Sequence, residues 1–340
     1  MLRLMLLLCA AMSLAASAQV ADSAPFYQGK TVTCYVGYGV GGAYDFYARE
    51  ISKFLPRHLA GEPRVVVENM PGASTMVLAN YLAKRAPRDG TAFGAVNSAL
   101  IFDPLFSGAQ SKAQFAGPDM TMIGNAVSAA AVLISWKTSG VNSFDDLRSK
   151  KLVIGAMTRT GDTYVLPLAV KRVLDLKNLE IVTGYPGSRE VLIALEQGEV
   201  SGRVWDMEGL HAVRPQWLKD GSIHVLAQLA SRAMPEVPAG VPLVTDFVVG
   251  ADDRKVLDVV FLTTLLARPF IAPPGIPADR VEALRAGFMG VMQDADFLAE
   301  MAMAQVEVGA IAGAEMQQHV RAAYALPGAI IEKVRGALAE

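Results

Sequence analysis

Cysteine is nearly absent from this chain of 340 residues, which contains only Cys9 and Cys34. Cys9 lies in an N-terminal segment that we expect to be removed, so Cys34 has no intramolecular disulfide partner. No later stretch has the roughly 18 consecutive apolar residues of a membrane-spanning helix. Stability must therefore come from apolar burial, and the 52% hydrophobic composition suits one large domain or two medium ones.

An excess of charge is also absent, because the formal net charge is −2. This balance does not predict a nucleic-acid or anionic-membrane surface. The four histidines lack metal-ligand spacing, and the chain has neither G-x-S-x-G nor S-x-x-K. Cys34 has no sequence neighbour that would activate its thiol, although a spatial partner stays open. We therefore expect no enzyme, no cofactor and no metal.

The first residues have the order of a secretory signal peptide. Arg3 precedes the apolar run from Leu4 to Leu14, and the small residues Ala16, Ser17 and Ala18 follow. The run is shorter than the ~20 residues that span a bilayer. We expect cleavage after Ala18, which removes residues 1–18 and leaves an exported, periplasmic protein.

Strand-like and helix-like segments alternate after the signal peptide. The expected order is strand 31–36, a helix from Tyr44, strand 65–68, helix 74–84 and strand 91–96. Such alternation predicts right-handed crossovers and a largely parallel sheet. The long apolar stretch around 120–136 breaks the rhythm, and we interpret it as a first crossing between domains.

A second alternating series predicts a second lobe. It begins at 152–157, and the proline-rich segment 234–242 is expected to return the chain to the first lobe. Beyond Pro274 the chain is expected to be mostly helical. We therefore predict an α/β fold of two lobes, residues 26–126 with 238–340 and residues 127–237. Each lobe would have a mainly parallel sheet flanked by helices, with the ligand cleft at the carboxyl ends of the strands.

A glycine cluster from Gly37 to Gly42 lies between the first expected strand and the first expected helix. Its backbone amides would approach an anion at the helix N-terminus. Gly37, Gly39 and Gly42 also satisfy G-x-G-x-x-G, and Glu68 stands where a ribose-binding acid would. An exported NAD(P)-dependent oxidoreductase is therefore kept as a less favoured alternative, because its cofactor would have to be exported with it.

Four segments together carry a resemblance to one family: residues 39–45 (GVGGAYD), 66–74 (VVENMPGAS), 86–91 (APRDGT) and 272–277 (APPGIP). Taken in this order and spacing, they make the chain similar to periplasmic substrate-binding proteins of the tripartite tricarboxylate transporter type, the Bug or TctC family. The similarity extends from about Tyr27 to Val308. Where the family has a proline-rich segment, this chain has Tyr38-Gly39-Val40.

The resemblance implies the periplasmic-binding-protein fold, with loops of both lobes holding a ligand carboxylate through backbone amides and ordered water. The ligand would be a di- or tricarboxylate, an amino acid or an aromatic acid. Its partners would be integral membrane transporter subunits, and the protein would act as a monomer. A sensor subunit for a two-component receptor kinase would use the same cleft and stays open as an alternative.

The expected ligand contacts follow strand ends and precede helices in both lobes. In the first lobe they are Gly39, Gly41, Gly42, Ala43, Asp45, Asn97 and Ser98. In the second lobe they are Thr158, Arg159, Thr160, Gly161, Thr163, Gly187, Ser188, Arg203 and Asp206.

Several of these residues also have a structural interpretation. Asp45 suits the first turn of a helix, and Asn97 suits a turn. Arg159 is either a solvated surface residue or a bidentate partner for a second carboxylate. The family usually has an aspartate after Val200, and here Arg203 and Trp205 follow instead. They would reshape the distal pocket, unless Trp205 only packs in the core.

Overall fold

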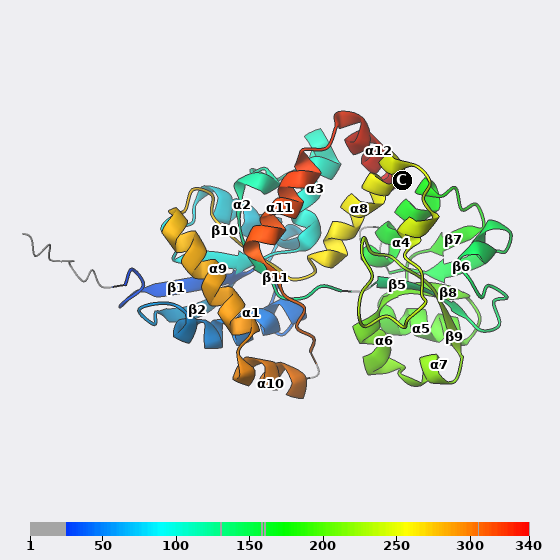
Figure 1. Cartoon of the computed structure of the whole chain (residues 1–340), viewed down its shortest axis with the longest axis horizontal. Coiled ribbons are helices and arrows are strands. Elements are labelled where there is room, and N and C mark those ends of the chain that lie inside the picture. Colours follow the sequence, from blue (N-terminus) through cyan, green and yellow to red (C-terminus); the bar gives the residue numbers. More distant parts are fainter. Residues whose placement is uncertain (1–24, 130, 158, 160, 305, 340) are drawn as a thin grey trace, which may run out of the picture.

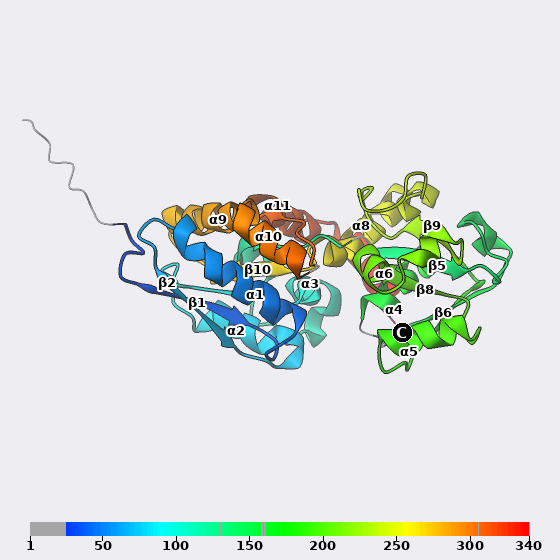
Figure 2. The same cartoon turned by 90° about the horizontal axis from the view of Figure 1, so that it is seen from below.

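The computed structural model describes residues 25–129, 131–157, 159, 161–304 and 306–339. The expected signal peptide and two expected ligand contacts, Thr158 and Thr160, lie outside these residues. Two separate sheets, each flanked by helices, form two lobes that lie side by side (Figures 1 and 2). The predicted two-lobed α/β fold is therefore confirmed.

The first lobe is built on a six-stranded sheet with the order β11-β4-β10-β3-β1-β2. β1 is parallel to β2 and β3, whereas β10 is antiparallel to β3 and β4. The sheet is therefore mixed, because β10 enters it from the opposite direction. Its strands are β1 (Thr31–Val36), β2 (Arg64–Asn69), β3 (Ala92–Ala95), β4 (Thr121–Asn125), β10 (Pro269–Ala272) and β11 (Ile311–Ala312).

Alternation in β1 explains how the first lobe closes its core. Val32, Cys34 and Val36 are fully buried, while the residues between them are at least partly accessible. Burial raises the pKa of the Cys34 thiol to about 12, which keeps it protonated and unreactive. Cys34 therefore packs as a small apolar residue, as the sequence predicted.

Helices cover the first sheet and turn their apolar faces toward it. In α1, the buried residues Tyr47, Ala48, Ile51 and Phe54 recur at helical spacing. No helix among the described residues is both long enough and apolar enough to cross a membrane. The helices of this lobe are α1 (Ala43–Phe54), α2 (Met76–Lys84), α3 (Ser98–Ser107), α9 (Ala278–Met292), α10 (Ala295–Met303) and α11 (Gly313–Tyr324).

The second lobe has a five-stranded sheet with the order β7-β6-β8-β5-β9. β6 is parallel to β7 and β8, and β5 is antiparallel to β8 and β9. Its strands are β5 (Ala131–Trp136), β6 (Leu152–Gly155), β7 (Leu179–Val182), β8 (Gly202–Asp206) and β9 (Ile223–Gln228). Its helices are α4 (Asp162–Val173), α5 (Ser188–Glu196), α6 (Met207–Val213) and α7 (Gln216–Lys219).

The return to the first lobe comes later than the expected boundary at residue 238. The backbone N–H of Gln228 donates to the carbonyl of Pro242 at 2.8 Å. The Phe144 and Phe247 rings lie 4.4 Å apart between centroids. The proline-rich segment therefore still packs on the second lobe, and the chain returns along α8 (Ala251–Leu265), which lies between the lobes in Figure 1.

The C-terminal helix α12 (Gly328–Leu338) connects the lobes a further time. It packs on α8, on α3 of the first lobe and on α4 of the second. Arg172 in α4 donates to the carbonyl of Gly336 at 2.9 Å. One apolar cluster continues from α3 through α8 and α12 into α4. The segment after residue 238 therefore serves both lobes and is not part of the first lobe alone.

The hinge between the lobes is organised by the fully buried side chain of Asn125, at the end of β4. Its Nδ2 donates to the carbonyls of Val127 at 2.7 Å and Leu265 at 3.3 Å. Its Oδ1 accepts from the N–H of Arg268 at 2.9 Å. Main-chain hydrogen bonds between Ala267 and Val127 and between Ala129 and Thr264 add to this link. The two crossing segments are therefore held against each other where the chain changes lobe.

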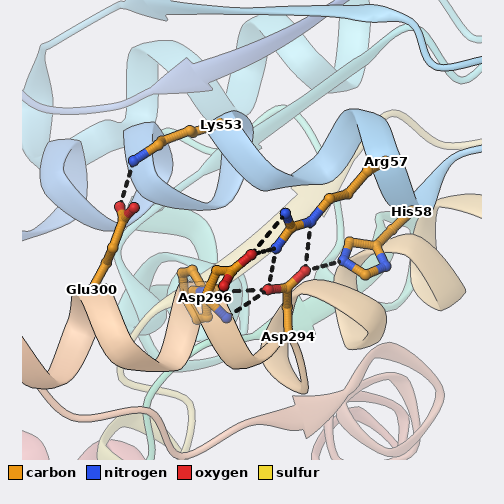
Figure 3. A network of polar contacts seen from close by, with 7 residues as sticks. Lys53, Arg57, His58, Asp294, Asp296 and Glu300 are labelled. Carbon is orange, nitrogen blue, oxygen red and sulfur yellow. Dashed lines mark hydrogen bonds and ion pairs between the residues drawn. The ribbon is translucent and has the colours of Figure 1, made fainter.

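A network of ion pairs attaches α10 to the end of α1 (Figure 3). Arg57 donates to both oxygens of Asp294, whose carboxylate also contacts His58 Nε2 at 2.7 Å. Asp294 also caps α10 by accepting from Phe297 N–H at 3.2 Å. The Arg57 guanidinium holds the pKa of Asp294 well below its usual range. This network fixes the outer edge of the first lobe and lies apart from the hinge.

We predict that Asn125→Ala lowers the free energy of unfolding by about 3 kcal/mol, because three buried backbone groups lose their partner. Urea denaturation followed by circular dichroism measures the change. The control is Asn80→Ala, since Asn80 also links two segments, at Lys112 and Gln114, but in solvent-accessible positions. Equal losses in the two variants would contradict a special role for Asn125.

Candidate functional site

A cavity of about 330 Å³ lies between the two lobes and reaches the hinge. The first lobe contributes Tyr44, Asn97 and Ser98. The second lobe contributes Ala131, Met157, Asp162, Thr163, Leu166, Ser188, Arg203, Val204, Trp205 and Asp206. The hinge and its surroundings contribute Val127, Ala129, Thr263, Thr264, Ala267, Arg268 and Glu307. The size suits a small ligand, and the lining combines apolar walls with polar groups.

First-turn residues of four helices meet at this cavity. They are Tyr44 in α1, Ser98 in α3, Asp162 and Thr163 in α4, and Ser188 in α5. The first N–H groups of a helix have no partner within the helix and carry partial positive charge. Helix N-termini from both lobes therefore give the cavity the character of an anion site.

Arg268 adds a full positive charge at the hinge. Its guanidinium lies over the Tyr44 ring, 4.6 Å from the centroid, and its Nη1 donates to the carbonyl of Ala267 at 2.8 Å. The Tyr44 hydroxyl donates to the same carbonyl at 3.1 Å. Among the described residues, the buried Nε of Arg268 has no acceptor. Arg268 is thus held in place where its side chain lines the cavity.

Arg203 is a second cation in the cavity wall. It is 2% exposed, lies 4.2 Å from the centroid of the Trp205 ring, and donates to Ser188 Oγ at 3.0 Å. Burial lowers its pKa to about 10, so it remains charged at neutral pH. Trp205 is 5% exposed, packs in the core of the second lobe and also lines the cavity. Trp205 therefore packs in the core and also borders the cavity.

Carboxylates also face the cavity. Asp206 caps α6 by accepting from the N–H of Gly209 at 2.6 Å. Glu307 already interacts with another group of the protein. Asp162 is accessible to solvent, although protein surrounds much of it in the cleft. This partial desolvation raises the pKa of its carboxyl, and the positive charge of Arg268 opposes the rise. The cavity therefore holds charges of both signs.

Asn97 is placed by a turn in an uncommon conformation. Ala73, Ser74 and Thr75 all have positive φ angles, which non-glycine residues rarely adopt. The buried Thr75 hydroxyl accepts from the N–H of Asn97 at 3.0 Å, and Asn97 Oδ1 accepts from the N–H of Ala99 at 2.9 Å. The turn therefore positions Asn97, which caps α3 at the cavity.

Asp45 does not line the cavity, contrary to the ligand role expected for it. Its carboxylate accepts from the N–H of Gly41 at 2.9 Å, from Asn69 Nδ2 at 2.8 Å and from Arg49 at 2.9 Å. The side chain is 3% exposed. These donors hold the pKa of Asp45 down at about 2, with the hydrogen bonds from Arg49 as the largest cause. Asp45 therefore stabilises the glycine loop and the first turn of α1.

Six of the expected contacts line the cavity: Asn97, Ser98, Thr163, Ser188, Arg203 and Asp206. Eight described ones do not: Gly39, Gly41, Gly42, Ala43, Asp45, Arg159, Gly161 and Gly187. Arg159 takes part in another interaction. Tyr44 and Asp162 line the cavity and were not predicted, although both directly follow expected contacts at helix starts. The sequence around Arg268 contains no motif that predicts a ligand contact, because Arg268 lies in the hinge, far along the chain from the glycine loop.

The glycine loop does not have the properties of a dinucleotide site. The N–H of Gly41 is already bound by the protein's own Asp45 carboxylate. A Cβ at Gly37 would lie 2.5 Å from Thr75 Cβ, so packing explains this glycine. Among the described residues, no cluster of three or more His, Cys, Asp or Glu residues could hold a metal ion.

No family model and no curated protein matches the chain. Solved structures are similar over almost its whole length. A ligand-free TctC solute-binding protein from Polaromonas is 14% identical, with a TM-score of 0.69 and coverage of 92% of this chain and 99% of that one. A Rhodopseudomonas palustris protein with adipate is 20% identical, with a TM-score of 0.58 and coverage of 90% and 97%.

MatC from Rhodopseudomonas palustris with bound malate is 19% identical, with a TM-score of 0.55 and coverage of 91% of this chain and 99% of that one. At these identities the likeness concerns the fold. The chain thus has the fold of TctC-type periplasmic binding proteins, as the resemblance of its sequence motifs implied.

We predict that Asp45→Asn destabilises the protein most above about pH 4. The ionised carboxylate has a folded pKa of about 2, below its unfolded value, so its stabilisation is lost as the pH falls toward 2. Urea midpoints of wild type and variant, measured between pH 7 and pH 3, should therefore converge as the pH falls. Asp145→Asn is the control, because the Asp145 side chain is 70% exposed. A constant difference between wild type and Asp45→Asn would contradict this origin.

Proposed function

We propose that the chain is a periplasmic solute-binding protein that captures a small carboxylate and delivers it to membrane transporter subunits of the tripartite tricarboxylate type. The signal-peptide pattern supports export, and the fold similarity supports a binding protein. The ligand enters the cavity between the lobes, and hinge motion closes the lobes around it. No bond is made or broken in this role.

One observation carries the proposal: helix starts from both lobes line a single cavity that also contains Arg268 and Arg203. A carboxylate there accepts hydrogen bonds from N–H groups and guanidinium donors. Because the donors belong to different lobes, a bound ligand favours the closed arrangement over the open one.

The first test is a thermal-shift screen of the chain from Gln19 onward, freed of bound ligand by unfolding and refolding. The panel contains di- and tricarboxylates, amino acids, aromatic acids, NAD and NADP. A ligand at 100 times its dissociation constant adds about 2.7 kcal/mol of stability. A shift with carboxylates supports the proposal. A shift in the unfolding temperature with only a dinucleotide contradicts it. The absence of a shift with every compound in the panel contradicts it as well.

We predict that Arg268→Gln weakens the binding of any carboxylate found in the screen by at least about tenfold, because a charged donor is lost from the cavity. Isothermal titration calorimetry measures the affinities of the variant and of wild type.

The matched control is Arg280→Gln. Arg280 also stacks on an aromatic ring, at 4.1 Å from the Phe26 centroid, and also has a buried Nε without an acceptor among the described residues. It does not line the cavity. Equal effects of the two substitutions would show that stacking, and not a ligand contact, explains the loss at Arg268.

A further inference from the structure

We infer that the ligand carries a protonated amine in addition to its carboxylate, and that Asp162 binds this amine while Arg268 binds the carboxylate. The inference rests on the proposed function and narrows it to amino acids and related zwitterions. It comes from two groups of opposite charge that face one cavity, and neither has an ion-pair partner among the described residues.

Asp162 is the carboxylate of the cavity that is free to meet a ligand. Asp206 already caps α6, and Glu307 is engaged in another interaction. In the part of the chain that the structure describes, the Asp162 side chain has neither a hydrogen bond nor an ion pair. Asp162 is the first residue of α4 and lines the cavity. Solvent reaches its side chain, although protein lies around much of it. A carboxylate in such a site gains more from a cationic partner than one on the open surface.

Arg268 is the complementary group on the other side of the cavity. Its stacking on Tyr44 and its bond to Ala267 fix the guanidinium, and its buried Nε lacks an acceptor among the described residues. Arg268 and Asp162 line the same cavity. The positive charge of Arg268 also opposes the rise in the pKa of the Asp162 carboxyl. No ion pair joins them in the described structure. A ligand with both charges would fill the space between them and neutralise each.

A ligand with carboxylates alone fits this charge pattern less well. One carboxylate would be bound at Arg268, but a second one directed toward Asp162 would be repelled by a like charge. Replacement of that group by an ammonium turns the repulsion into a charge-assisted hydrogen bond. The Asp162 carboxylate therefore favours ligands with an amine and disfavours dianions.

Two pairs of acids that differ by one amino group test this inference: succinate with aspartate, and glutarate with glutamate. Calorimetry on wild type should show the amino acid of a pair binding at least about tenfold more tightly. Asp162→Asn should remove this preference by weakening the amino acid, while the plain diacid binds equally well or more tightly.

Asp145→Asn is the matched control, because it removes one negative charge at an exposed position that does not line the cavity. It should leave the preference for the amino acid in place. The thermal unfolding of each ligand-free variant is measured as well, so that a change in fold is distinguished from a change in recognition.

The outcomes separate this inference from the proposed function. If plain diacids bind wild type as tightly as their amino counterparts, the amine site is refuted and the carboxylate-binding function stands. If Asp162→Asn weakens every ligand equally, Asp162 serves lobe closure through Arg268 and not amine recognition. If neither member of either pair binds, while other carboxylates do, the amine inference also fails. If no carboxylate binds at all, the proposed function itself fails.

Discussion

The structure depends on the buried amide of Asn125, which links the two segments that cross between the lobes. A buried amide is costly unless its donor and acceptor are both used, and here they bind main-chain groups of both crossing segments. Arg268, whose N–H is one of those groups, is also one of the two arginines that line the cavity. The link between the crossing segments therefore also positions a charge of the cavity.

The recognition surface is produced by topology more than by any one motif. Parallel strands end at the same edge of each sheet, and the helices that follow begin there. The two lobes present these edges to each other, so Ser98 and Thr163 line one cavity although different lobes supply them. Conversely, α12 and α8 pack across the lobes through apolar contacts, which join one lobe to the other.

Local patterns in the sequence predicted the parts of the fold that local physics controls. The alternation around β1 and the helix start after the glycine loop are of this kind, and so is the burial of Cys34. The short strands β10 and β11 were not predicted, because four and two residues give no periodicity to detect. Helix α8 was missed as well, since it is buried on several sides and lacks one clear apolar face.

The site was predicted where it follows strand ends and missed where it depends on the three-dimensional path of the chain. Asn97 and Ser188 directly precede or begin a helix, so their position at the cavity could be inferred. Tyr44 contacts Ala267, 223 positions later, and no local pattern announces that contact. The role of Asp45 was open in the sequence because a first-turn carboxylate can turn toward a ligand or toward its own loop. The geometry of its donors decided between them.

All three tryptophans of the chain lie in the second lobe, and only one of them borders the cavity. Trp217 packs against both Trp136 and Trp205, with ring centroids 4.9 and 6.2 Å apart. Trp205 faces the cavity beneath the Arg203 guanidinium. The protein thus carries its own optical reporter. A ligand in the cavity would alter the surroundings of one indole, and excitation passed among the three edge-to-face rings would spread that local change to the whole emission.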